Sequence, residues 1–131
     1  MERGGDYLQK DKVVAIYRKA IESLYTHTVT VVERETLYNT EKHRDEAYEK
    51  VVYKDEPCRI SFNSQDNRQE GDVSKARETV KLFIRPEVVI NNSSKVIANI
   101  NGNTVRFDLS SPPFIYETHR EYLLTYEEEP N

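Results

Sequence analysis

The sequence predicts a mainly β fold: a small antiparallel β-barrel or sandwich of about seven strands, preceded by one amphipathic helix and interrupted by one long inserted loop. Two observations lead to this prediction. Apolar and polar residues alternate with period 2 in short segments between residues 26 and 126, which is the pattern of half-buried strands. Only one segment, near the N-terminus, has helical spacing, so the sequence contains no βαβ units. At 131 residues, the chain is expected to form a single domain.

The N-terminal part is predicted to be a polar tail followed by a helix. Residues 1–11 contain Gly4-Gly5 and are expected to form a flexible tail. Asp11 is a suitable N-cap for a helix over residues 12–24, because its carboxylate can accept backbone N–H groups of the first turn. Apolar side chains recur along this helix every three to four residues, at Val13, Tyr17, Ala20/Ile21 and Leu24.

The β-region, residues 26–126, begins with alternating threonines and valines. The polar and charged stretch 36–48 is interpreted as a long hairpin tip, and residues 48–54 as the returning strand. Pro57 then opens another strand, in which one face carries Cys58, Ile60 and Phe62.

Residues 63–77 are predicted to form a long loop, because they contain almost no apolar residues and no periodicity. A structureless loop of about 15 residues inside a compact domain is usually either functional or disordered, and both interpretations are open here. A strand over residues 79–85 follows, and Pro86 ends it.

The clearest local signal is Asn101-Gly102, which supplies the two positive-φ residues of a type I′ hairpin turn. It predicts a hairpin of residues 95–100 and 103–109. Residues 110–113 are expected to be an extended link, residues 119–126 the last strand, and residues 127–131 an acidic tail.

The composition limits both the core and the partners. The chain has 13 Val, 8 Ile, 7 Leu and 4 Phe, about 24% of its residues, against 32% charged residues and a mean hydropathy of −0.80, so we expect a thin core. A net charge of −4 argues against a general DNA or RNA binder, which relies on Lys and Arg. The N-terminus lacks the apolar region of a signal peptide, and no apolar run reaches membrane-spanning length, so we expect a cytoplasmic protein without a membrane segment.

No catalytic or metal-binding pattern is found, and we expect no enzyme activity, cofactor or metal. The single cysteine, Cys58, excludes an internal disulfide and is interpreted as a small core residue. His43, Asp45 and Glu46 include metal-ligand types, but they are interleaved with basic residues and are interpreted as a solvated loop. The four glycines form no phosphate-binding loop.

The nine tyrosines are the most informative residue type, because tyrosine is enriched at protein interfaces. They also substitute for missing Trp and scarce Phe in a core, and both interpretations are open. The predicted interface residues are Tyr17, Tyr25, Tyr38, Tyr48, Tyr116 and Tyr122. Stacking of bases on these rings would require accompanying basic residues, which the acidic balance disfavours.

Several apolar and proline-containing blocks occur in a recognisable order. They are residues 18–25, 56–62, 80–87, 94–97, 101–102, 111–116 and 118–121. Together they resemble the minor capsid, or head-closure (head–tail joining), proteins of tailed phages and defective prophages of Gram-positive bacteria. The resemblance covers about residues 13–126, and residues 63–77 match least.

This resemblance implies a structural protein of the virion neck. Such proteins form a homo-oligomeric ring, a hexamer or a dodecamer, on the portal and adaptor; they close the DNA exit channel and provide the docking surface for tail terminator and tail tube proteins. Packaged double-stranded DNA passes the channel without specific binding. The resemblance places the subunit in the host cytoplasm during assembly and then in the neck, and it implies neither catalysis nor a cofactor. It also places the long loop at the channel, with the candidate residues Asn63, Gln65, Asp66, Arg68, Glu70, Gly71, Asp72, Lys75 and Arg77.

Two alternatives remain at this stage. One is an adaptor or tail-terminator subunit of the same neck. The other, from a different class, is a small antiparallel-barrel module that binds single-stranded nucleic acid. Under the neck interpretation, the thin core predicts a free subunit of modest stability that gains stability on assembly by mass action.

Overall fold

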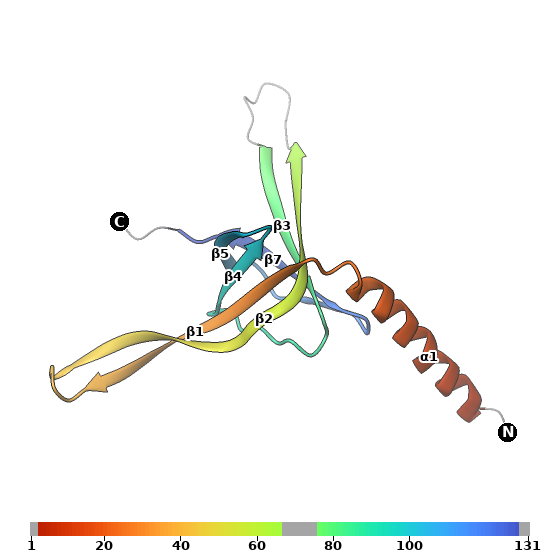
Figure 1. Ribbon diagram of the computed structural model, residues 1–131, viewed down its shortest axis with the longest axis horizontal. Helices are drawn as coiled ribbons and strands as arrows, with labels where there is room; N and C mark the ends of the chain where they lie inside the picture. The colour runs from red at the N-terminus through yellow and green to blue at the C-terminus, as the bar shows by residue number, and fades with distance from the viewer. Residues whose placement is uncertain (1–2, 67–75, 129–131) are drawn as a thin grey trace.

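The computed structural model describes residues 3–66 and 76–128, and the side chains of residues 9–63 and 79–128. In this part of the chain one helix is followed by seven strands, and all strand pairs are antiparallel. The elements are α1 (Arg3–Glu22), β1 (His27–Asn39), β2 (Arg44–Asp66), β3 (Ala76–Ile84), β4 (Lys95–Ile100), β5 (Asn103–Leu109), β6 (Phe114–Ile115) and β7 (Arg120–Tyr126) (Figure 1). The predicted fold class, mainly β with an N-terminal helix, is confirmed.

The sheet closes on itself, which decides between the barrel and the sandwich. Its strand order is β3-β2-β1-β4-β5-β7-β6, and an additional pairing joins β3 to β7. That pairing runs from Val80↔Leu124 to Ile84↔Arg120, so six strands form a ring and β6 lies on the edge of β7. Closure removes the open edges that a small sheet would otherwise expose.

The barrel interior holds one small hydrophobic core. Its buried members alternate along the strands with half-buried or exposed residues, as period 2 requires. They are Val29, Val31, Cys58, Ile60, Val80, Leu82, Ile84, Val88, Ile90, Val96, Ala98, Phe107, Tyr122 and Leu124. Cys58 is fully buried, as predicted, and burial raises the pKa of its thiol to about 12.

The β4–β5 hairpin has the predicted boundaries. Asn101 and Gly102 adopt positive φ angles of 53° and 87°, which is the requirement that identified the turn. The side chain of Asn99 accepts a 3.1 Å hydrogen bond from the Gly102 N–H. The turn residues therefore set the register of both strands.

The predicted hairpin tip over residues 36–48 is wrong, because most of these residues belong to strands. β1 and β2 stay paired from Glu33↔Lys50 to Asn39↔Arg44, so only residues 40–43 form the turn. We call residues 33–50 the arm; it extends away from the barrel (Figure 1). Both faces of this two-stranded ribbon are wet, so its sequence lacks the apolar alternation by which a half-buried strand is identified.

Two β-bulges lie at the root of the arm. The register shifts between Val29 and Val31 and again between Val31 and Val32, with the extra residues on β2. At the bulged region Asp55 has a φ of 50°, and its N–H donates to the Thr30 hydroxyl at 3.2 Å. Pro57, predicted to open a new strand, lies instead within the continuous strand β2, where it pairs with Thr28 just beyond the bulges.

The helix begins earlier than predicted. α1 spans Arg3–Glu22, so most of the predicted flexible tail is helical and Asp11 is an interior residue, not the N-cap. Residues 6–11 contain no proline, which would end a helix. Gly4 and Gly5 each lower the stability of a helix by about 1 kcal/mol, and this cost does not prevent the helix from including them. No helix in the described part of the chain is long and apolar enough to cross a membrane.

The predicted loop over residues 63–77 is shorter than expected. β2 and β3 remain paired from Cys58↔Ile84 to Asp66↔Ala76, and this β2–β3 hairpin projects from the barrel in a direction different from the arm (Figure 1). Residues 67–75 lie outside the described residues. The short strand β6, within a segment expected to be irregular, was not predicted.

Tyr122 fastens the segment after β3 to the barrel. Its ring is fully buried, its hydroxyl donates to the Val88 carbonyl at 2.9 Å, and the Ile90 N–H donates back to the same oxygen at 3.1 Å. One side chain thus satisfies two buried backbone groups where no strand partner is available.

Replacing Tyr122 with Phe is expected to lower the free energy of unfolding by about 1–3 kcal/mol, because a buried N–H and a buried C=O lose their partner. Urea denaturation measures the change. Tyr25→Phe is the matched control, since the buried Tyr25 hydroxyl has no hydrogen-bond partner among the described residues. Equal destabilisation by both variants would contradict the assigned role of the Tyr122 hydroxyl.

Candidate functional site

The first candidate surface is an apolar stripe on α1 that faces away from the barrel. Its exposed fractions are 48% for Val13, 68% for Ile16 and 62% for Tyr17, and Ala20 is also exposed. At 100° per residue these four side chains lie within one face of the helix. Leu24, which was predicted to end the helix, lies in the turn after Glu22 and is 55% exposed. The half-buried side chains of the helix, which include Val14, lie on another side. The helix therefore presents its apolar face to solvent.

An ion-pair network holds the other side of the helix against the barrel. Arg18 donates to Glu22 at 2.6 Å and also binds Glu87, which lies after β3. Arg85 in turn binds Glu56 through two hydrogen bonds of 2.8 and 3.0 Å, and reaches Glu87 at 3.5 Å. The Arg85 guanidinium lowers the pKa of Glu56, and Arg18 lowers that of Glu87.

The Arg85–Glu56 pair predicts a pH-dependent contribution to stability. Because the folded-state pKa of Glu56 is lowered, the pair stabilises the protein above the ordinary carboxyl pKa, and this contribution is lost as the pH falls through the lowered value. Arg85→Gln is expected to cost about 1 kcal/mol at pH 7, with a difference from wild type that shrinks below about pH 4.5. Urea denaturation from pH 3 to pH 7 tests this, and a difference independent of pH would contradict it.

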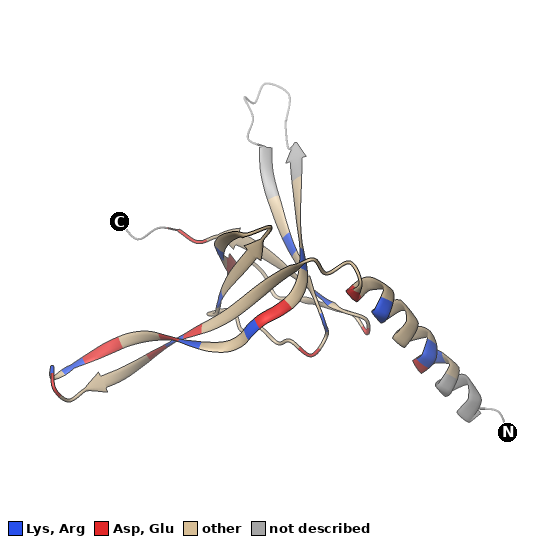
Figure 2. Ribbon diagram, in the orientation of Figure 1, with Lys and Arg blue, Asp and Glu red and all other residues tan. Residues whose placement is uncertain are grey.

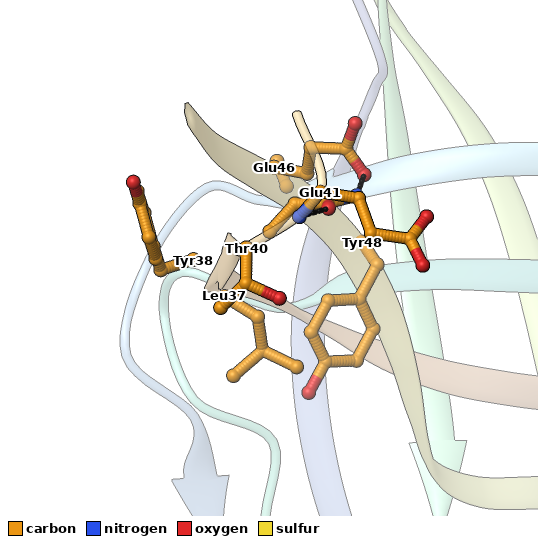
Figure 3. A pocket seen from close by; sticks show the side chains of 8 residues that line it. Leu37, Tyr38, Thr40, Glu41, Glu46 and Tyr48 are labelled. Carbon is orange, nitrogen blue, oxygen red and sulfur yellow. Dashed lines mark hydrogen bonds between the residues drawn. The ribbon is translucent and has the colours of Figure 1, made fainter. Parts of the chain in front are cut away.

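The second candidate surface is a shallow hollow near the tip of the arm, of about 460 Å³. Leu37 from β1 and Tyr48 from β2 lie side by side there, whereas Tyr38 points away from them (Figure 3). The Tyr48 hydroxyl donates to Glu35, which raises the pKa of Tyr48 and lowers that of Glu35. The full lining is Leu37, Tyr38, Asn39, Thr40, Glu41, Glu46, Ala47 and Tyr48.

The hollow lies on the face of the arm that points away from the barrel. On the opposite face, Glu49 binds Arg106 of β5, and Arg106 also binds Glu127 at 3.2 Å. Residues 35, 37, 46 and 48 share the other face, because paired residues of a ladder point to the same side. As with the helix, charged groups attach the element to the barrel and leave its apolar residues exposed.

A third exposed apolar group lies at the β6–β7 turn. Phe114, Ile115 and Tyr116 are about half exposed, at 52%, 63% and 47%. The Tyr116 ring stacks on His119 at 4.8 Å between centroids, and His119 Nε2 lies 2.8 Å from a carboxylate oxygen of Glu121. This group lies near α1, because Lys10 binds the neighbouring Glu117 at 3.6 Å.

The predicted interface tyrosines divide into three groups. Tyr17, Tyr38, Tyr48 and Tyr116 are exposed and remain candidates for an interface. Tyr25 is half-buried, and burial raises the pKa of its hydroxyl to about 12. The prediction for Tyr122 is wrong: this residue is a fully buried core residue with both backbone partners inside the barrel.

The predicted channel residues are only partly described. Asn63 is exposed on β2, and the backbones of Gln65, Asp66 and Arg77 belong to the β2–β3 ladder. The remaining candidates, Arg68, Glu70, Gly71, Asp72 and Lys75, lie outside the described residues. The turn of the arm contains His43, and the first residues of β2 include Asp45 and Glu46. No group of three metal-ligating side chains occurs in the described part of the chain.

Sequence reasoning missed Ile16, Leu37 and Ile115 as surface residues. Ile16 follows the helical spacing of the stripe, so a helical projection of the sequence identifies it. Leu37 is a lone apolar residue in a polar stretch, and only its position beside Tyr48 across the ladder shows that it belongs to a surface.

The described residues thus define a small closed antiparallel β-barrel with three projections: the helix, the arm and the β2–β3 hairpin.

No protein-family model matches the chain, and no curated protein matches it. One solved structure similar to this chain is that of the phage-like element PBSX protein xkdH from Bacillus subtilis. It shares 12% sequence identity, with a TM-score of 0.49, over 77% of this chain and 93% of that one. A likeness at this level does not assign a function.

Proposed function

We propose that this protein is a structural subunit of a phage neck, which forms a ring on the portal or adaptor, closes the DNA exit channel after packaging and provides the docking surface for the tail. The observation that carries the proposal is the exposure of apolar side chains on elements that project from the barrel, the helix at one end and the arm at the other. The order of the sequence blocks supports the neck as the place of assembly.

A ring subunit requires two different surfaces that meet across each subunit boundary. The helix and the arm lie at opposite ends of the longest axis of the molecule (Figure 1). Surfaces placed in this way can connect each copy to the next. A partner that buries Ile16, Tyr17 and Leu37 would gain about 1.5–3 kcal/mol of free energy for each large side chain removed from water. These residues therefore favour an assembled state.

The β2–β3 hairpin is the third projection, and we assign it to the channel. Its ladder starts in the barrel wall at Cys58↔Ile84 and continues to Asp66↔Ala76 beyond the core. A net charge of −4 suits a channel in which DNA slides, since few phosphate contacts form.

The surroundings of Tyr48 favour a protein partner over a nucleic acid. The Tyr48 hydroxyl binds the Glu35 carboxylate, and Glu46 lines the same hollow. A phosphate backbone near this ring would face acidic side chains, which disfavours the single-stranded nucleic-acid module.

The proposed location is tested by electron microscopy of particles produced from the genome that encodes this chain, with a gold-binding tag on its C-terminus. We expect label at the junction of head and tail, and heads that leak DNA when the gene is deleted. Neighbouring genes should encode portal and capsid proteins on one side and tail proteins on the other. Label elsewhere on the particle, or normal DNA retention without the gene, would overturn the proposal.

A further inference from the structure

The apolar stripe of α1 and the face of the arm that carries the hollow are similar in length. From Val13 to Ala20 the stripe is about 10 Å long at 1.5 Å per residue. From Glu35 to Asn39 this face of the arm is about 13 Å long at 3.3 Å per residue. Each surface has apolar side chains near its middle or tip, Ile16 and Tyr17 on the helix and Leu37 and Tyr48 on the arm, and neither is covered by its own barrel.

The charges of the two surfaces are complementary. Residues 9–24 of the helix region carry four basic and two acidic side chains, whereas residues 33–50 of the arm carry six acidic and four basic ones (Figure 2). Within the described residues, Lys12 and Lys19 beside the stripe form no ion pair, and neither does Glu41, which lines the hollow. Complementary charges of this kind orient two partners at an interface.

We propose that the stripe of α1 in one copy of this chain docks on the hollow of the arm in a neighbouring copy, with Ile16 and Tyr17 over Leu37 and Tyr48. Lys12 and Lys19 then lie near Glu41 of the neighbour. Since the helix and the arm lie at opposite ends of the barrel, the contact is head-to-tail and each copy uses both surfaces. The contact is inferred from these two surfaces alone. The closure of such contacts into a ring rests on the proposed function.

The contact is tested by disulfide cross-linking between two differently tagged variants with one added cysteine each, Ile16→Cys and Leu37→Cys, mixed at high concentration and also co-expressed during particle assembly. The native Cys58 remains in both, because it is fully buried and does not interfere. We expect a mixed dimer at least tenfold more abundant than with the control pair Ala15→Cys and Leu37→Cys. Ala15 is exposed but lies on the opposite side of α1 from the stripe.

Charge reversal gives a second readout. Lys12→Glu with Lys19→Glu is expected to weaken self-association at least tenfold in sedimentation experiments, and adding Glu41→Lys in the same chain is expected to restore at least part of it. Lys54→Glu with Arg59→Glu changes the net charge equally on exposed positions outside both surfaces and should leave association unchanged.

Equal cross-linking by Ala15→Cys, or no mixed dimer from Ile16→Cys and Leu37→Cys in either setting, would overturn the contact. If the label of the previous experiment lies in the neck while this cross-link is absent, the subunit interface is wrong and the proposed function stands. If the cross-link forms in a protein that never reaches the neck, the interface stands and the proposed function fails.

Discussion

Phe107→Ala is expected to lower the free energy of unfolding by about 3–5 kcal/mol, because it removes a large, fully buried side chain from a small core. Phe107 lies on β5, opposite Val96 of β4 and Tyr126 of β7, and its ring lies 5.2 Å from that of Tyr126. The cavity would therefore open where three strands of the barrel meet. Domains of this size have total stabilities of only about 5–15 kcal/mol, so the variant should be partly unfolded at 37 °C.

Urea denaturation followed by far-UV circular dichroism measures this loss. Phe114→Ala removes the same side chain from an exposed position on β6 and is expected to change the stability by less than about 0.5 kcal/mol. If the two variants lose similar stability, the hydrophobic core is not where the structure places it.

Replacing residues 35–48 with Asn-Gly is expected to abolish incorporation into particles while leaving the barrel folded. The replacement joins Arg34 to Glu49, which are cross-strand partners, and it retains the ion pair between Glu49 and Arg106. No side chain in the removed segment is buried, so we expect the free energy of unfolding to change by less than about 1 kcal/mol. The hollow is lost entirely, and with it the surface proposed to meet the next subunit.

Particle incorporation is measured by immunoblotting purified particles, and folding by urea denaturation. Thr36→Ala is the control: it changes an exposed residue on the face of the arm opposite Leu37 and Tyr48, outside the hollow, and it keeps the length of the arm. Normal incorporation of the shortened protein would show that the arm is not needed for assembly.

The elements that the sequence predicted well are those with a local physical cause. Asn101-Gly102 fixes its hairpin because two consecutive positive φ angles admit few other residues. Alternation at Cys58 and Ile60 predicted a strand because one side of it is buried.

The elements that the sequence predicted poorly depend on contacts far along the chain. The arm is polar on both faces, so no alternation marks it as strand, and its pairing is visible only in the register between β1 and β2. Tyr122 was grouped with the interface tyrosines because tyrosine suits an interface and a core equally well. Its burial depends on the segment around Val88, which lies more than 30 residues away.

The sequence predicted that the helix has an apolar surface, but it did not predict toward which side that surface points. Helical spacing identified an apolar stripe on the helix, but spacing alone does not say whether a stripe faces its own barrel or a partner. The ion pair of Arg18 decides this, because it attaches another side of the helix to Glu87.

A single strand, β2, connects the proposed subunit contact to the proposed channel element. It runs without a break from Arg44 on the arm, through the barrel wall at Cys58 and Ile60, to Asp66 on the β2–β3 hairpin. Its two ends lie in two projections that leave the barrel in different directions (Figure 1). The bulged region at Asp55 separates the arm from the part of the strand that the core holds at Cys58 and Ile60. One continuous strand of each subunit therefore contributes to both proposed surfaces.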